Sequence, residues 1–269
     1  MIKKQYFFIL ILLCPLFLHS QNVLEAEGDV KVSGKISNVT DPAAPQDAAT
    51  KNYVDRAIIF LALNEATDTT GTVQSLLDVG LSPSAFLDAG IDSSRFIGLT
   101  YQGGIIFYMR NDGTGLAAAP PNWLGVNQPD PKELWGCPTV DLPAVPNVVS
   151  ILTDVGAQIG DGASNTTAIL SPGNCPTAPA ALICASYMGA GHTDWHLPSI
   201  EELRTMRANI GQGISLGPNA NIAQFSDELY VSSSESDGTN TWFLNFMSNG
   251  IGLFAKDSGS FRVRPIRAF

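Results

Sequence analysis

Charged side chains are scarce in this sequence, and positive ones are scarcer than negative ones. Asp, Glu, Lys and Arg make up 15% of the 269 residues, and 25 acidic against 15 basic residues give a formal net charge of −10. No basic patch compensates for this balance. Because nucleic-acid binding depends on Lys and Arg contacts to phosphates, the composition argues against a nucleic-acid-binding protein. It also weakens the case for sulfated polyanions as ligands.

The sequence also lacks an apolar run long enough to span a membrane. Lys3 and Lys4 precede an apolar run from Tyr6 to Leu18, which at about 13 residues is short of the roughly 20 that a spanning helix needs. Ser20 then offers a small side chain for cleavage before Gln21. We therefore predict that residues 1–20 are a signal peptide. The protein would be exported to the cell surface or the extracellular medium, with no membrane span left. Losing both lysines would change its net charge from −10 to −12.

Cysteine is rare, with four residues in the whole chain. Cys14 would leave with the signal peptide, and the bulky residues before it disfavour lipid attachment. An exported protein meets an oxidising compartment, so the remaining three predict a disulfide. Cys175 and Cys184 would close a short loop, and we favour that pair. Cys137 would then be unpaired or would take part in an alternative pairing, because sequence alone does not fix the connectivity.

The segment that follows the signal peptide predicts a strand and then a helix. Residues 21–34 have an extended pattern in which Val30 and Val32 alternate with polar residues. Asp47 or Thr50 could cap a helix over residues 51–63. The apolar stripe of this helix would consist of Tyr53, Val54, Ala57, Ile58 and Leu61.

Residues 36–55 contain a run of the form DP…DAATKxYVD. This run resembles the stalk segment of phage tail-fibre proteins and bacterial surface fibres. The resemblance implies an elongated homotrimer, so we predict a tail-fibre-like stalk over residues 21–65. The alternative is a single helix that packs on a neighbouring domain.

A ten-residue repeat follows the Thr/Asp/Gly-rich linker at residues 66–72. Residues 76–81 match residues 86–91, and Phe96 begins a partial third copy. Each copy predicts one short helix, with Ser82 as a cap, Pro83 in the first turn and Gly90 at the end. Units this small must stack to bury a core. The run resembles short helical repeats of bacterial surface proteins, and we interpret residues 66–98 as a linker and spacer.

From residue 99 the pattern becomes α+β. A strand over residues 103–109 would form a hairpin with residues 115–119. Ser199 and Glu202 form a capping box that opens a helix to about residue 209. The other elements that we predict are helices at 165–170 and 179–188, strands at 229–235, 241–247 and 250–256 with an Asn249-Gly250 turn, and a closing strand at 261–269.

Residues 99–269 resemble the C-terminal domain family of bacterial collagen-like adhesins, which is related in pattern to the Fibrobacter major-paralogue domains. The runs that carry the resemblance are Tyr101–Tyr108, Trp135–Cys137, Gly160–Gly162 with Asn165 and Thr166, Ala180–Cys184, Asp194–Ser199 with Glu202 and Leu203, Ser232–Glu235, Trp242, and Val263–Phe269. The resemblance implies a C-type-lectin-like fold and adhesion to glycans. Val231 stands where this pattern has Trp, which is a mild change if that position packs the core and puts ligand binding in doubt if it contacts the ligand.

Two groups of residues raise the question of a metal. His192 and His196 flank Asp194, but no third ligand accompanies them, and a zinc site needs three or four. Asp154, Asp161 and Asn165 lie in an acidic, Gly-rich loop that could supply oxygen ligands to calcium. The alternative is a turn held by Asp and Asn side chains. The Gln/Glu-Pro-Asn/Asp triplet of calcium-dependent lectins is not present in the expected form, so we predict no cofactor and keep calcium as an alternative.

The candidate ligand-binding residues are Asn122, Trp123, Asp161 and Asn165. The four tryptophans can all be core residues, and Trp123 is the best candidate among them for a sugar-stacking platform, because it lies in a Pro-rich loop without apolar periodicity. By contrast, we interpret Ser232–Glu235 as structural residues that satisfy buried backbone groups. Gly213–Gly217 matches the nucleophile-elbow spacing, but it follows a helix and not a strand, so we predict a loop.

Together these features predict an exported binding or adhesion protein that recognises a glycan or an extracellular-matrix ligand and is not an enzyme. Multivalent lectin-like heads on a trimeric stalk would strengthen weak contacts. One alternative is a structural fibre component without a soluble ligand. The other is an enzyme of the formylglycine-generating type, in which Cys175 and Cys184 would be the reactive pair.

Overall fold

The computed structural model describes residues 50–64, 66, 68–212 and 221–269. All of them belong to one compact unit, Asp41–Phe269. The predicted signal peptide, the predicted extended segment at 21–34 and the loop predicted at 213–217 lie outside the described residues.

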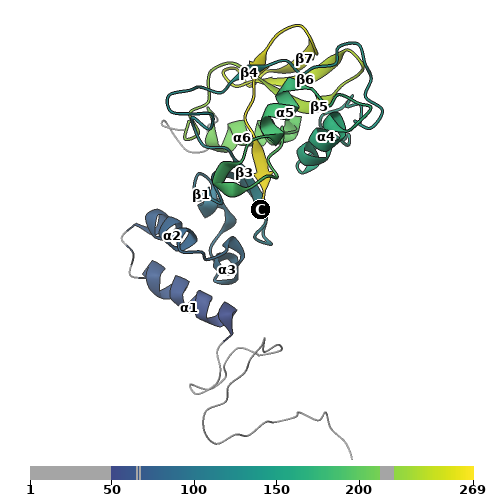
Figure 1. The fold of residues 1–269 in the computed structure, drawn as a ribbon. Helices are drawn as coiled ribbons and strands as arrows, with labels where there is room; N and C mark the ends of the chain where they lie inside the picture. The colour runs from purple at the N-terminus through teal and green to yellow at the C-terminus, as the bar shows by residue number, and fades with distance from the viewer. Residues whose placement is uncertain (1–49, 65, 67, 213–220) are drawn as a thin grey trace, which may run out of the picture. The chain divides into compact units, whose positions relative to one another are not determined.

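Three α-helices and one 3-10 helix open the described chain (Figure 1). They are α1 (Lys51–Asn64), α2 (Thr69–Asp78), α3 (Pro83–Asp88) and η1 (Ser93–Phe96). Asp68, Ser82 and Asp92 cap the last three, because each side chain accepts a hydrogen bond from a backbone N–H in the first turn. We predicted a linker at residues 66–72, but α2 begins within it, at Thr69, because Asp68 supplies this cap.

Glycines end the repeat units as predicted. Gly80, Gly90 and Gly98 have φ values of 98°, 86° and 87°, which only glycine adopts without strain. The units stack: Phe86 packs edge-on against Phe96, with ring centroids 5.5 Å apart. Their shared core also includes Ile106 of the first long strand of the following domain. The repeats are therefore packed against that domain.

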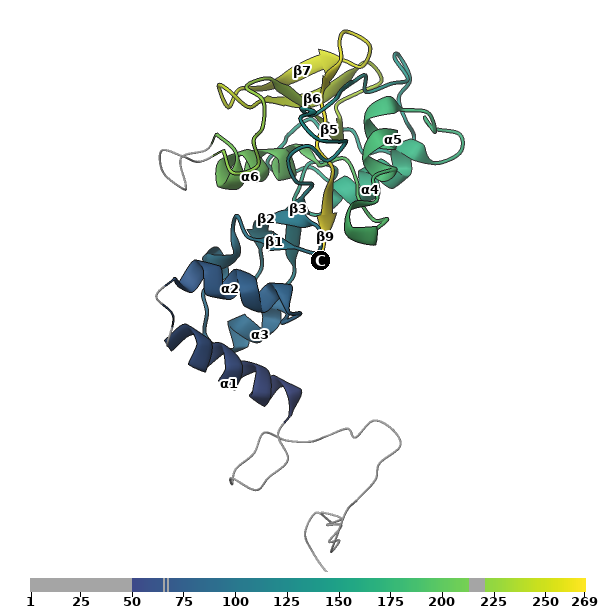
Figure 2. The same ribbon diagram turned by 60° about the vertical axis from the view of Figure 1, so that its left-hand side comes forward.

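The first sheet has four antiparallel strands in the order β1-β2-β3-β9. They are β1 (Thr100–Tyr101), β2 (Gly104–Met109), β3 (Gly115–Ala118) and β9 (Ile266–Ala268). The predicted β2–β3 hairpin is confirmed. β9 runs along β3, so the end of the chain pairs with the start of the domain (Figure 2).

The second sheet has five strands in the order β4-β8-β5-β6-β7. They are β4 (Lys132–Glu133), β5 (Leu229–Glu235), β6 (Asn240–Asn245), β7 (Ile251–Ala255) and β8 (Phe261–Arg262). Asn249, with φ 61°, forms the predicted turn between β6 and β7. The predicted single closing strand at 261–269 is wrong: Pro265, which has no N–H to donate, separates β8 from β9, and the two halves join different sheets.

Helices α4 (Asp161–Leu170), α5 (Pro179–Ala185) and α6 (Ile200–Ile210) pack beside the sheets, and η2 (Gly189–Gly191) follows α5. The capping box at the start of α6 is confirmed, since Ser199 and Glu202 exchange both hydrogen bonds. One core lies around α6 and the two sheets, and a second lies around α4, α5 and the segment that includes Trp123 and Trp135. The chain is thus α+β, as predicted. Within the described ranges, every helix is too short or too polar to cross a bilayer.

Candidate functional site

The predicted stacking residue Trp123 lies in the core, where it is 9% exposed. Its indole nitrogen donates a hydrogen bond to Oδ1 of Asp130 at 2.8 Å, and its ring packs edge-on against Tyr187. Asp130 also accepts from Nε of Arg264 and from the Tyr230 hydroxyl, both at 2.6 Å. Burial raises the pKa of Tyr230, which keeps its hydroxyl protonated as a donor. Asp130 and its three donors, Trp123, Tyr230 and Arg264, form a buried network that we call the Asp130 network.

The Asp130 network corrects two expectations from the sequence. Trp123 offers no free face to a sugar, and Asn122 is the exposed member of that pair. Moreover, Gln128-Pro129-Asp130 does have the form of the lectin triplet. Both carboxylate oxygens of Asp130 are nevertheless bonded to protein side chains, and the carboxylate forms a buried ion pair with Arg264, so this triplet holds the fold.

Asp161 and Asn165 do not converge on a shared ligand position. Asp161 accepts hydrogen bonds from the backbone N–H groups of Gly156 and Gln158 at 2.7 and 2.9 Å. Asn165 is 1% exposed and donates to the Gly156 carbonyl and the Ser233 hydroxyl. Asp154 accepts from two backbone N–H groups of its own loop. These side chains therefore hold turns, as in the alternative to calcium binding.

The run Ser232–Glu235 is completely buried, which agrees with a structural role. Ser234 links two segments, because its hydroxyl donates to the Gly156 carbonyl and accepts from the N–H of Ile200. Glu235 pairs with Lys256, and the Lys256 ammonium lies 4.6 Å from the ring centroid of Trp135. Burial raises the pKa of Glu235. Val231 is also fully buried, so replacing the expected Trp changes core packing.

The two histidines do not form a metal site with Asp194. Asp194 makes two bonds to the Arg267 guanidinium, at 2.9 and 3.0 Å. His196 is 4% exposed, and its Nδ1 donates to the Asp194 carbonyl at 3.2 Å. Across the described part of the chain, no group of three or more His, Cys, Asp or Glu residues is placed to hold a metal ion.

We expect His196 to make the fold sensitive to acid. Burial lowers its pKa from 6.5 to about 4, so the unfolded chain binds a proton at a pH where the folded chain does not. The contribution of His196 to the free energy of unfolding should therefore fall by about 3 kcal/mol in total as the pH drops from above 6.5 to below 4. Glu202 acts in the opposite direction over the same range, because burial raises its pKa to about 7. The loss due to His196 is therefore measured as the difference in pH dependence between the wild type and His196→Asn, by urea unfolding at pH 7.5 and pH 4.5. His196→Asn keeps a donor for the Asp194 carbonyl and should lose less stability than the wild type between the two pH values, and an equal change in both proteins would contradict a role for His196.

The cysteine pairing differs from the prediction. Cys137 and Cys175 form the disulfide, and Cys184 is a buried thiol with no disulfide partner in the described residues. The physical reason is that Cys184 lies on the buried face of α5, beside Ala180 and Ala181 in the second core. Burial raises the pKa of the Cys184 thiol well above its usual value, so it is a poor nucleophile. The Cys175–Cys184 pair that the enzyme alternative requires is not formed.

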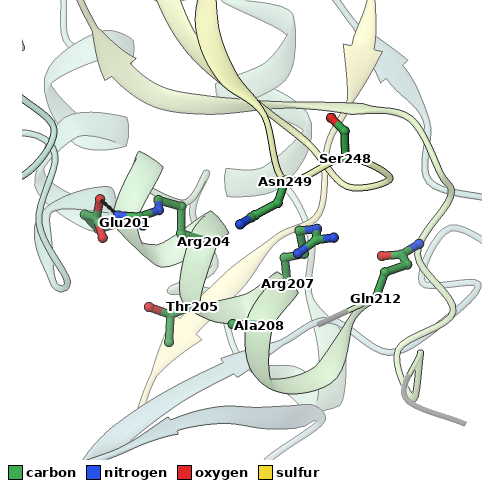
Figure 3. Close-up of a pocket in the computed structure, with 8 residues that line it drawn as sticks. All are labelled: Glu201, Arg204, Thr205, Arg207, Ala208, Gln212, Ser248 and Asn249. Carbon is green, nitrogen blue, oxygen red and sulfur yellow. Dashed lines mark hydrogen bonds and ion pairs between the residues drawn. The ribbon is translucent and has the colours of Figure 1, made fainter. Parts of the chain in front are cut away.

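An open groove of about 580 Å³ lies between α6 and the β6–β7 turn (Figure 3). We call it the α6 groove. Its lining residues, all but Ala208 with polar side chains, are Glu201, Arg204, Thr205, Arg207, Ala208, Gln212, Ser248 and Asn249. Sequence reasoning missed this site, because α6 and the turn are about 40 residues apart along the chain. The one local signal was the polar face of the predicted helix.

The α6 groove presents hydrogen-bonding groups in fixed positions. Nε of Arg207 donates to the Phe246 carbonyl at 2.6 Å, which ties α6 to the end of β6, and partial burial lowers the pKa of this guanidinium. Arg204 pairs with Glu201 at 2.6 Å. Gln212 donates to Asp227 at 2.7 Å. The groove thus offers donors and acceptors at low net charge, which suits a hydroxyl-rich ligand better than a strongly charged one.

Residues 161–267 match the family model described as the Lcl C-terminal domain. The match runs from α4 to β9 and is consistent with the adhesin-like family that the sequence resembles. It includes the α6 groove, and it leaves out Trp123, Cys137 and the helical repeats. A search of curated proteins finds no match.

Proposed function

We propose that this protein is an exported adhesion protein whose C-type-lectin-like head binds a glycan or matrix ligand in the α6 groove. The observation that carries the proposal is a polar, open groove inside the part of the chain that matches an adhesin-like domain family. The polar side chains of the domain interior are engaged in holding the fold, and catalysis forms no part of the proposal.

Weak single contacts fit this proposal when several heads act together. The groove is open to solvent, and a single site of this kind would bind a saccharide weakly. We infer that α1 supplies the multivalency by joining three copies of the chain into a homotrimeric stalk. Affinity then increases through effective concentration without any new contact to the ligand.

The exposed side of α1 supports self-association. Tyr53, Val54, Ile58, Phe60 and Leu61 are between 42% and 69% exposed. Val54, Ile58 and Leu61 follow i, i+4, i+7 spacing, so they form one seam along the helix. Of the fourteen residues of α1, Ile59 is the one that is buried against the repeats. The predicted apolar stripe therefore faces solvent in a single chain.

The glycan proposal is tested on a broad glycan and matrix-protein array, with residues 21–269, in calcium and then in chelator. We expect binding to one ligand class. The double variant Arg204→Ala, Asn249→Ala should weaken it about tenfold, because it removes donors from both walls of the groove. Arg110→Ala, on the β2–β3 hairpin, is the charge-matched control and should bind as the wild type does.

The outcomes separate the candidate functions. If the groove variant binds the ligand as tightly as the wild type does, the ligand site lies elsewhere on the head. Loss of ligand binding in chelator would show that the site requires calcium. A trimer that binds nothing on the array would favour the structural-fibre alternative, which the apolar seam of α1 also supports.

A further inference from the structure

Residues 148–158 form a loop that displays aliphatic side chains to solvent, and we call it the aliphatic loop. Val149, Leu152 and Val155 are 82%, 71% and 70% exposed. They recur every third residue, and the loop lies before the matched domain family begins at residue 161. It is therefore a feature of this chain that the family match does not cover.

The aliphatic loop is fixed from within. Asp154 accepts hydrogen bonds from the N–H groups of Val149 and Ser150 at 2.9 and 2.7 Å. The Gln158 side chain donates to the carbonyls of Ile151 and Asp154 at 3.0 and 3.2 Å. Such bonds leave the backbone little freedom to fold its apolar tips inward.

The aliphatic loop is also attached to the domain on both sides. Val148 is fully buried and bonds to the Glu235 carbonyl through its N–H, and Trp242 donates to the Val148 carbonyl. Ala157 is fully buried and accepts from the N–H of Glu201. Ile151 packs against the first core. The loop therefore has inward residues that anchor it to the domain, and three outward residues that do not contribute to the core.

Along the chain, the charged residues on either side of the aliphatic loop are acidic. The chain has no Lys or Arg between Lys132 and Arg204, whereas Asp141, Asp154 and Asp161 lie in that stretch. The bonds from the N–H groups of Ser150 and Val149 lower the pKa of Asp154, so it is an anion at neutral pH. Arg204, on the neighbouring helix α6, is already paired with Glu201.

We propose that the aliphatic loop docks a protein partner that has an apolar pocket rimmed by Lys or Arg. Three rigidly held aliphatic side chains can enter such a pocket without a loss of loop entropy, and the surrounding carboxylates are complementary to a basic rim. A membrane fits less well, because the loop has no aromatic or basic residue for the interface and would be repelled by anionic lipids. A second copy of this acidic loop would be repelled in the same way.

The probes are three immobilised peptides of equal length, which alternate Leu with Lys, Leu with Glu, and Ser with Lys. We expect residues 21–269 to bind the Leu/Lys peptide about tenfold more tightly than either of the others. The triple variant Val149→Ser, Leu152→Ser, Val155→Ser should lose this preference. The control triple Val79→Ser, Val126→Ser, Met188→Ser removes similarly exposed apolar side chains elsewhere and should keep it.

Hydrogen exchange in the bound state should show protection centred on residues 149–156. The proposal is overturned if the loop variant binds like the wild type, if the Leu/Glu or Ser/Lys peptide binds equally well, or if no peptide binds. It is also overturned in favour of a lipid surface if phosphatidylcholine vesicles, with or without phosphatidylserine, bind the wild type and not the loop variant. The test is independent of the α6 groove, which neither triple variant alters.

Discussion

Replacing Asp130 with Ala is expected to lower the free energy of unfolding by about 3–5 kcal/mol, because it leaves Arg264 as a buried and uncompensated cation. Arg264 is 2% exposed, so water cannot take the place of the carboxylate. The same change removes the acceptor of the Trp123 indole and of the Tyr230 hydroxyl. Equilibrium unfolding in urea, followed by tryptophan fluorescence, measures the loss.

Two further variants separate the buried charge from general damage. Asp257→Ala removes an exposed carboxylate and should change stability by less than about 0.5 kcal/mol. Adding Arg264→Met to Asp130→Ala removes the stranded cation and should recover part of the loss, since a buried ion pair can be replaced by apolar groups at little cost. If the free energy of unfolding of Asp130→Ala is within about 1 kcal/mol of the wild-type value, the Asp130 network does not organise this part of the core.

The second large effect is expected from α1. Changing Val54, Ile58 and Leu61 to Ser removes the apolar seam, and we expect the protein to change from a trimer to a monomer. All three side chains are more than 40% exposed in a single chain, so the fold of the head should not change. Sedimentation velocity of residues 21–269 measures the mass of the assembly directly.

The triple variant of the aliphatic loop is the matched control for α1, because it removes the same number of exposed aliphatic groups from another surface. It should remain trimeric. A wild-type protein that sediments as a monomer at micromolar concentration would contradict the trimeric stalk and leave the groove proposal intact. If the wild-type protein sediments as a dimer, the seam of α1 would still be the interface, but two helices would share it instead of three.

Local signals predicted much of the secondary structure, because each depends on residues that are close in sequence. The capping box of Ser199 and Glu202, the turn at Asn249 and the glycines that end the repeats are all of this kind. The failures involve distant partners. Trp123 is buried because Tyr230 and Arg264, more than 100 residues away, meet it at Asp130.

The disulfide and the α6 groove were missed for the same reason. Cys137 and Cys175 are 38 residues apart, whereas short-range reasoning favoured the nearer Cys184. No pattern within α6 indicates that the β6–β7 turn forms its opposite wall. By contrast, the resemblance to the adhesin domain carried long-range information, and it placed the matched runs in one α+β domain.

The Cys137–Cys175 bond also determines what a protease can release from this protein. Residues 138–174 form a covalently closed ring that contains the aliphatic loop and much of the irregular, exposed backbone of the domain. A single cut inside this ring cannot separate the two resulting pieces while the disulfide is intact. In an oxidising compartment, where the disulfide stays closed, a domain that is cut once inside this ring would remain joined to its helical repeats.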